Sequence, residues 1–256
     1  KRNEILKACV SEQELERTKT LIAPVIRGRD VQTYQNPKTD LWLISTFPSK
    51  QYDIEMYPAV KNFILSFGME RVEQTGIKRI INGQEVKARK KTKHKWFETQ
   101  DPIAYWEDLA KPKIVWKRIG SILRFAYDED KSMCLDSTCF ATGKYVKFLC
   151  ALFNSKLGHF ILQDSPKTGT GDLLVSVQAI EPIHVPMPDE DFRSKIENDV
   201  DRILSAKKSN PQSDTSSEEH EIDRLVYELY GLTNGEVKII DPNETTVGSD
   251  DDLFKA

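Results

Sequence analysis

The sequence predicts a mixed α/β (α+β) domain over residues 1–188, followed by a helical region over residues 189–240. Two observations carry this prediction. Up to residue 188, stretches with the apolar pattern of strands alternate with stretches whose apolar residues recur every three or four positions, as in helices. Beyond Pro182, Pro186 and Pro188 the pattern is helical only. Residues 241–256 are expected to be a disordered acidic tail.

In the first third of the chain, a helix, a strand and a second helix are expected. Ser11 and Glu14 have the spacing of a capping box, and Pro24 is expected to end the helix that they begin. Leu41–Ser45 has the composition of a buried strand. Pro58 suits the first turn of the second helix, whose apolar stripe is expected in the core: Val60, Phe63, Ile64 and Phe67.

A β-hairpin is expected next, and it leads into a dense run of cations. Asn82-Gly83, between apolar residues, is the signature of a type I′ turn. The cations follow the second arm of the hairpin, so a projecting ribbon should present them. This basic run consists of Lys87, Arg89, Lys90, Lys91, Lys93 and Lys95.

The second half of the α/β domain should contain two paired strands and a helix. Lys113–Trp116 and Ile122–Tyr127 have strand patterns and should be joined by a turn at Gly120. One continuous amphipathic helix should cover Val146–Leu157. A flexible loop then leads into a strand over Leu173–Val177.

The helical region should consist of helices with one apolar face each. Ser216–Glu219 and Thr233–Glu236 both match the capping box that begins a helix. Helices of this kind are marginal alone, so they are expected to pack on each other or on a partner.

Charge is distributed unevenly along the chain. Between Lys78 and Arg124 there are 13 Lys and Arg against 5 Asp and Glu, whereas from Asp189 onwards there are 8 against 18. A basic middle and an acidic end indicate two separate functional surfaces.

The basic middle segment suggests a surface that holds a nucleic-acid backbone. Lys and Arg neutralise phosphates, and aromatic rings either stack on bases or fill a core. The candidates for DNA contact in this segment are the basic run together with Trp96, Lys117 and Arg118. The alternative is a solvated basic loop beside an ordinary aromatic core.

Two arginines and one further lysine outside this segment are also candidates. Gly28 should let the backbone turn sharply so that Arg27 and Arg29 project, and arginine binds phosphate or guanine through paired hydrogen bonds. The alternative for these arginines is a salt bridge with Asp30. Lys167 lies in a loop of small residues that suits close approach to a DNA backbone, but the interpretation that the sequence favours is a simple connection.

No catalytic residue or metal site is predicted in this chain. The four cysteines are Cys9, Cys134, Cys139 and Cys150. They form no C-x-x-C pair and the four histidines are scattered, so reduced thiols are expected rather than a zinc site, and a cytoplasmic location is expected. No apolar run approaches the roughly 20 residues that a membrane helix needs. The chain begins with Lys and is expected to be a fragment of a longer protein.

Several segments, in this order, resemble one known family. The chain is similar to the target-recognition domain of Type IIG restriction–modification enzymes, the TaqI-like C-terminal specificity domain, over roughly Ala23–Ile240. Moderately specific motifs carry the resemblance: Val25–Val31, Tyr57-Pro58, the basic run, Trp96 with Tyr105-Trp106, Lys111–Trp116, Leu152–Lys156, Ile183–Pro188 and Glu221–Leu232.

The resemblance implies binding without chemistry. Such a domain chooses the double-stranded DNA sequence on which an upstream adenine-N6 methyltransferase, often fused to an endonuclease, acts in bacterial defence. S-adenosylmethionine would bind that upstream domain of the parent chain, and no cofactor is expected here. The residues agree, since no Asn/Asp-Pro-Pro-Tyr/Phe segment is present. The alternative is a protein-interaction module that docks a partner subunit through its acidic helices.

Overall fold

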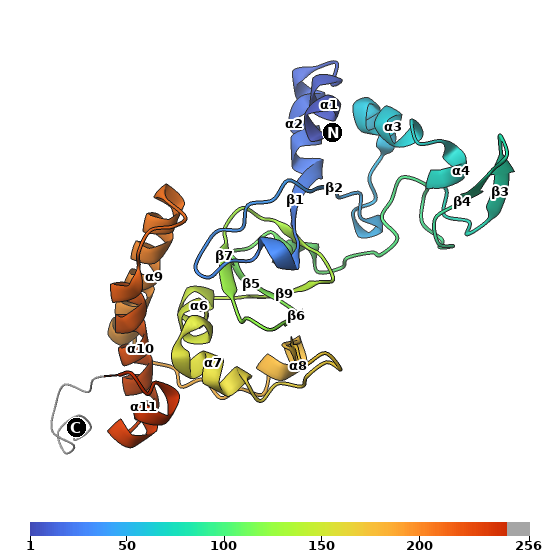
Figure 1. Cartoon of the computed structure of the whole chain (residues 1–256). Helices are drawn as coiled ribbons and strands as arrows, with labels where there is room; N and C mark the ends of the chain where they lie inside the picture. The colour runs from blue at the N-terminus through green and yellow to red at the C-terminus, as the bar shows by residue number, and fades with distance from the viewer. Residues whose placement is uncertain (245–256) are drawn as a thin grey trace. The chain divides into compact units, whose positions relative to one another are not determined.

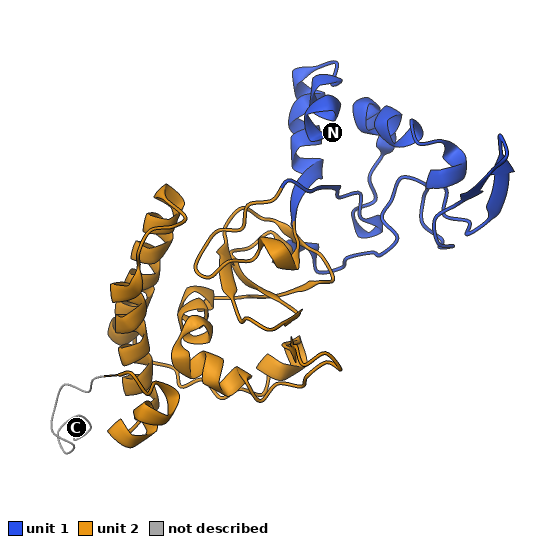
Figure 2. Ribbon diagram, in the orientation of Figure 1, with its two compact units in different colours: residues 1–25, 40–108 blue, residues 26–39, 109–256 orange. Residues whose placement is uncertain are grey.

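The computed structural model describes residues 1–244 and divides the chain into two compact units. Unit 1 comprises residues 1–25 and 40–108, and unit 2 comprises residues 26–39 and 109–256 (Figure 2). The mixed α+β class is confirmed. The predicted disordered tail lies outside the described residues from residue 245 onwards.

Unit 1 is built from short helices around a small apolar core. Its helices are α1 (Arg2–Lys7), α2 (Glu12–Leu21), α3 (Pro58–Leu65), α4 (Met69–Val72) and α5 (Trp106–Leu109), and its strands are β1 (Ile22–Ile26), β2 (Trp42–Ile44), β3 (Lys78–Ile81) and β4 (Gln84–Lys87). The core consists of Ile5, Leu21, Ile22, Ile54, Ala59, Val60 and Phe97.

A buried carboxylate connects the starts of α2 and α3. The Ser11 hydroxyl accepts a hydrogen bond from the backbone N–H of Glu14 (3.1 Å), which confirms Ser11 as the helix cap. The Glu14 carboxylate accepts from the N–H of Val10 at 2.9 Å and from the N–H of Ala59 at 2.8 Å. One acidic side chain therefore satisfies orphan donors at two helix ends.

Three expectations for unit 1 were wrong in detail. Helix α2 ends at Leu21, before Pro24, because Ile22 already has the extended backbone of β1. Strand β2 is only three residues long and is not buried, since Trp42 is 39% exposed. Phe67 lies beyond the end of α3 and is 46% exposed, so the apolar stripe reaches the core only through its earlier members.

The β3–β4 hairpin is confirmed. Its antiparallel register pairs Ile81 with Gln84. Asn82 and Gly83 both have positive φ, 50° and 78°, as the two central residues of a type I′ turn must.

Unit 2 has a three-stranded antiparallel sheet with β5 (Lys113–Lys117) between β7 (Phe125–Asp128) and β9 (Thr138–Thr142) (Figure 1). Alternate side chains of β5 enter two cores. Ile114 and Trp116 join the larger core, whereas Val115 joins Ile26 and Val31 on the other face. The smaller elements are the 3₁₀-helix Gly28–Asp30, β8 (Met133–Cys134), α8 (Val177–Ile180) and the two-stranded ribbon of β6 (Ile119–Gly120) with β10 (Leu173–Leu174).

The helix expected over Val146–Leu157 is two helices, α6 (Val146–Asn154) and α7 (Lys156–Leu162). Ser155 ends the first and caps the second, because its hydroxyl accepts from the N–H of Gly158 at 3.1 Å. A Cβ at Gly158 would lie 2.1 Å from the carbonyl oxygen of Leu152, so the bend requires glycine. Hydrophobic periodicity continued across this bend and therefore concealed it.

The C-terminal helices are present as predicted: α9 (Glu190–Ser209), α10 (Ser216–Tyr230) and α11 (Asn234–Ile240). Their apolar faces, including Ile196, Val200 and Ile222, are buried in the same core as the sheet, beside α6 and α7. The capping box at Thr233 is confirmed. At α10 the cap position is Thr215, one residue earlier than expected, and its hydroxyl donates to Glu219 (2.5 Å). A division of the chain at residue 188 stays a prediction.

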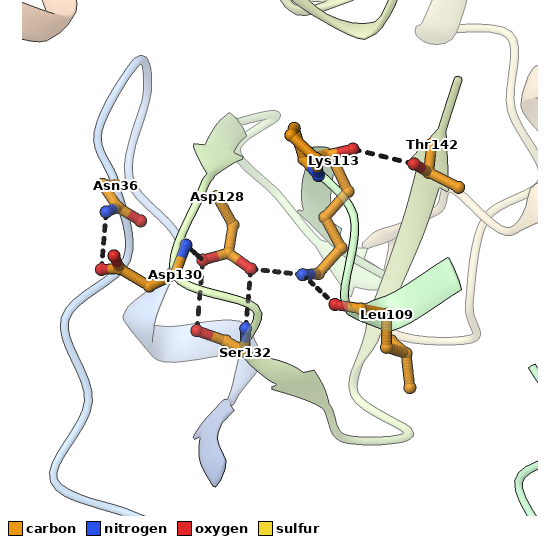
Figure 3. Close-up of polar contacts among 8 residues, drawn as sticks. Asn36, Leu109, Lys113, Asp128, Asp130, Ser132 and Thr142 are labelled. Atoms are coloured by element: carbon orange, nitrogen blue, oxygen red, sulfur yellow. Dashed lines mark hydrogen bonds and ion pairs between the residues drawn. The ribbon is translucent and has the colours of Figure 1, made fainter. Parts of the chain in front are cut away.

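A buried ion pair closes one end of the sheet (Figure 3). Lys113 and Asp128, both fully buried, form a salt bridge, and the Lys113 ammonium also donates to the carbonyl of Leu109 at 2.8 Å. The Asp128 carboxylate accepts three further hydrogen bonds, from the N–H of Asp130 and from the N–H and hydroxyl of Ser132. These bonds satisfy the buried charges and fix the turn that leaves β7.

Candidate nucleic-acid interface

The basic run forms a loop of unit 1 in which lysines face solvent and other side chains face inward. Its five lysines are exposed: Lys87, Lys90, Lys91, Lys93 and Lys95. Between them, Ala88 is buried and Thr92 is half-buried. We call residues 87–96 the basic loop. Exposed lysines thus alternate with inward-facing side chains, so the ammonium groups face solvent while the inward-facing side chains attach the loop to unit 1.

Gln74 is buried and forms hydrogen bonds to the inner side of the basic loop, and the sequence patterns did not indicate this residue. Its buried amide nitrogen donates to the carbonyls of Lys95 and Glu98, both at 2.8 Å. Its amide oxygen accepts from the hydroxyl of Thr92 at 2.8 Å, and its backbone carbonyl accepts from the N–H of Thr92 at 3.1 Å. Three of these four hydrogen bonds hold the basic loop itself, and the fourth holds Glu98 just beyond it.

Arg89, in contrast to the lysines, points into unit 1. Its guanidinium donates to the carbonyls of Trp96 (3.1 Å) and Glu98 (2.7 Å), and burial lowers its pKa. Trp96 is half-buried against the unit 1 core and meets Phe97 edge to face, with ring centroids 5.4 Å apart. These contacts give both residues a structural role, and their contact with DNA stays a prediction.

In unit 2, the two arginines around Gly28 differ in their surroundings. Arg27 forms a two-pronged salt bridge with Asp30, at 2.8 and 3.0 Å, which is the alternative that the sequence left open. Burial raises the pKa of Asp30, but hydrogen bonds and charge from Arg27 outweigh it and leave that pKa below its ordinary value. Arg29 is exposed to solvent.

A turn of the chain is not the reason why position 28 is a glycine. Gly28 begins a 3₁₀-helix, whose right-handed backbone any residue adopts. A Cβ at this position would instead lie 2.9 Å from Cγ of Lys117 and 3.2 Å from the carbonyl oxygen of Ser137. Glycine is required by the close approach of these two residues, which no local pattern could reveal.

Ser137 joins the segments that carry the unit 2 cations. Its hydroxyl accepts from the N–H of Gly28 (3.1 Å), and its carbonyl accepts from the N–H of Arg118 (3.0 Å). The carbonyl of Arg118 accepts in turn from the N–H of Val175 at 2.9 Å, just after β10. Leu173 of that strand pairs with both Gly120 and Lys167.

These connections bring four exposed cations onto adjacent segments of unit 2: Arg29, Lys117, Arg118 and Lys167. We call them the cationic junction. Within residues 1–244, no acidic side chain forms a salt bridge with any of the four. Unpaired exposed cations on a rigid backbone are suited to binding phosphates. That the basic loop and this junction share one concave surface stays a prediction.

A hollow of about 820 Å³ on unit 2 is lined in part by Arg29 of the cationic junction, but it does not extend the positive surface. It lies between the segment 29–38 and the C-terminal half of α9. Its walls carry charges of both signs, including Lys38, Lys208, Glu129 and Asp201. Mixed charges do not favour a polyanion.

Two other kinds of site are not found in the part of the chain that the structure describes. No helix there is long and apolar enough to cross a membrane. No group of three or more His, Cys, Asp or Glu side chains in residues 1–244 could hold a metal ion.

The family is established by sequence. Residues 23–178 match the TaqI-like C-terminal specificity domain. The match covers more than half of the chain, so the chain belongs to this family of specificity domains, which supports a role in recognising a DNA target. No curated protein matches the chain.

Among solved structures, two restriction enzymes have partial likeness to this chain. The Type IIL restriction–modification enzyme MmeI, solved in complex with DNA, shares 12% sequence identity and a TM-score of 0.54; the likeness covers 88% of this chain and 30% of MmeI. The Type IIG restriction endonuclease BpuSI shares 12% identity and a TM-score of 0.42, over 85% of this chain and 27% of BpuSI. The chain thus spans less than a third of either enzyme.

Proposed function

We propose that this chain is the sequence-specific, double-stranded DNA recognition module of a restriction–modification enzyme. One observation carries the proposal: a chain of this specificity-domain family presents unpaired, rigidly supported cations in both of its units. In unit 1 these are the lysines of the basic loop, and in unit 2 they are the cationic junction.

Contacts to the phosphates and contacts to the bases would have separate roles. Lysines of the basic loop bind phosphates of the duplex and set the register, which gives affinity without sequence preference. Exposed Arg29 is a candidate to read a guanine edge, whereas Arg27 first has to leave Asp30. An upstream adenine-N6 methyltransferase domain of the parent protein would bind S-adenosylmethionine and extrude the target base, so a second domain must hold the duplex.

The alternative, docking of a partner subunit through the acidic helices, has less support. The apolar faces of α9 and α10 are buried in the core of unit 2, and the helices therefore lack the apolar surface that protein interfaces bury at their centre.

Salt-dependent binding to a duplex tests the proposal. If four cations meet phosphates, the slope of log K against log salt should be about −3.6. Replacing Lys90, Lys91 and Lys93 by Ala should reduce its magnitude by about 2.7, at about 0.9 per phosphate.

A matched control separates position from net charge. The triple variant K195A/K208A/K238A removes three exposed lysines from the C-terminal helices and should leave affinity and slope unchanged. Equal effects of the two triple variants would show that only net charge matters and would contradict the proposal.

A further inference from the structure

The side chain of Lys117 lies between two glycines that are far apart in sequence. A Cβ on Gly28 would meet its Cγ at 2.9 Å, and a Cβ on Gly120 would meet its Cδ at 3.2 Å and its Nζ at 3.3 Å. The two glycines thus border successive parts of one lysine side chain, from stem to ammonium. Gly120 has no positive φ, so its backbone also tolerates a side chain.

The backbone beneath this side chain is fixed on both sides. Lys117 is the last residue of β5 and pairs with Thr138 of β9. Its neighbour Arg118 is bonded through its N–H to Ser137 and through its carbonyl to Val175. An exposed lysine at a strand end ordinarily samples many rotamers, and a rigid backbone with two close neighbours restricts them.

We propose that Lys117 is a pre-positioned phosphate-binding residue, and that Gly28 and Gly120 act as positioning residues for it. This inference rests on the proposed DNA binding. Immobilising a long side chain on binding weakens an interaction, and a side chain that is already confined loses less freedom. Lys117 would therefore contribute more to duplex affinity than a lysine whose side chain is not confined.

The role of the charge is tested by K117M in the full chain. Methionine retains a flexible unbranched stem without the ammonium, so folding should be unaffected. The salt slope for duplex binding should decrease in magnitude by about 0.9, the value for one phosphate. An unchanged slope would overturn the assignment of Lys117 to a phosphate.

The role of the glycines is tested by a double-mutant cycle. G28A should weaken duplex binding by about 2- to 12-fold when Lys117 is present, the range for immobilising one side chain. In the K117M background G28A should have no further effect. G235A in α11 is the matched control, because the nearest atom to a Cβ at that position is the Thr233 hydroxyl at 4.0 Å, and it should bind as tightly as the wild type.

Two results would overturn the positioning role. One is wild-type affinity in G28A, and the other is equal weakening by G28A in both backgrounds, which would mean that it acts through Ser137 instead. If G28A fails to fold, G120A in the same two backgrounds decides. Failure of the wild-type chain to bind any duplex would refute the proposed function itself, whereas wild-type binding with neutral G28A and K117M refutes this inference alone.

Discussion

Among single residues, Lys113 and Asp128 illustrate how strongly one contact can determine local order. Both are fully buried, and the Asp128 carboxylate also organises the turn over Asp130 and Ser132. A buried charge is tolerated only while its partner remains, because an unpaired ion in the interior retains the full desolvation cost.

D128A should therefore lower the free energy of unfolding by about 3–5 kcal/mol, since it leaves the Lys113 ammonium buried without a counter-charge. Urea unfolding measures this change. E85A is the control: it breaks the exposed Lys78–Glu85 pair (2.9 Å) and should cost less than about 1 kcal/mol. Comparable costs for the two variants would argue against the buried pair as a structural centre.

Residue roles at the candidate interface were only partly predictable. Exposure of the five lysines could be predicted from the residue types alone, because burying an unpaired ammonium group costs several kcal/mol. The inward direction of Arg89 and the pairing of Arg27 with Asp30 depend on which carbonyls and carboxylates lie nearby. Gln74 and Ser137 gave no signal at all, because single polar residues carry no periodicity.

Among the elements, the basic loop depends on Gln74 for its shape. Q74A should remove the hydrogen bonds to Lys95, Glu98 and the Thr92 side chain, so that the loop opens more often. Trypsin should then cleave after its lysines faster than in the wild type, while duplex affinity falls.

Q163A, a change of an exposed glutamine at the end of α7, is the control for Q74A and should leave the cleavage rate unchanged. If Q74A is cleaved no faster than Q163A, the loop owes its order to other contacts.

The joint between α7 and α10 should make stability depend on pH. Asp223 on α10 accepts a hydrogen bond from the N–H of Lys156 at 2.8 Å. Burial raises the pKa of Asp223 from 3.8 to about 6, although this bond and the Lys156 charge lower it. Asp241 raises it further and His220 lowers it.

Because the folded state holds this proton more tightly than the unfolded state, the free energy of unfolding should fall as pH rises from about 4 to about 6 and should then level off. The decrease due to Asp223 is at most about 3 kcal/mol. D223N should flatten the profile of unfolding free energy against pH in that window. A profile for D223N that parallels the wild type would assign the pH dependence to other groups.

The elements themselves were largely predictable where the signal is local. The hairpin turn, the caps at Ser11 and Thr233 and the C-terminal helices depend on neighbouring residues, and they are present. The bend at Ser155 and the early end of β10 were missed: the bend rests on the contacts of Ser155 and Gly158, and just after β10 the N–H of Val175 bonds to the distant carbonyl of Arg118. There, a continuous apolar pattern was compatible with more than one structure.

At the scale of the whole molecule, we expect this chain to bind DNA without catalysing a reaction. The purified chain of 256 residues should transfer no methyl group from S-adenosylmethionine to duplex DNA, because its sequence contains no Asn/Asp-Pro-Pro-Tyr/Phe segment to hold an extruded adenine. Radiolabel transfer, with an active adenine methyltransferase as positive control, measures this. Methylated duplex would place chemistry in this chain and contradict its role as a recognition module.

The order of the chain through its two units bears on how such modules recombine. Residues 26–39 belong with residues 109–256, although the whole of 40–108 separates them in sequence. A gene exchange with one breakpoint near codon 108 would take Gly28 from one parent and Lys117 from the other. Such a hybrid would keep the fit of lysine to glycine only if the first parent encodes the glycine and the second encodes the lysine, so inheritance should link the two codons across the intervening segment.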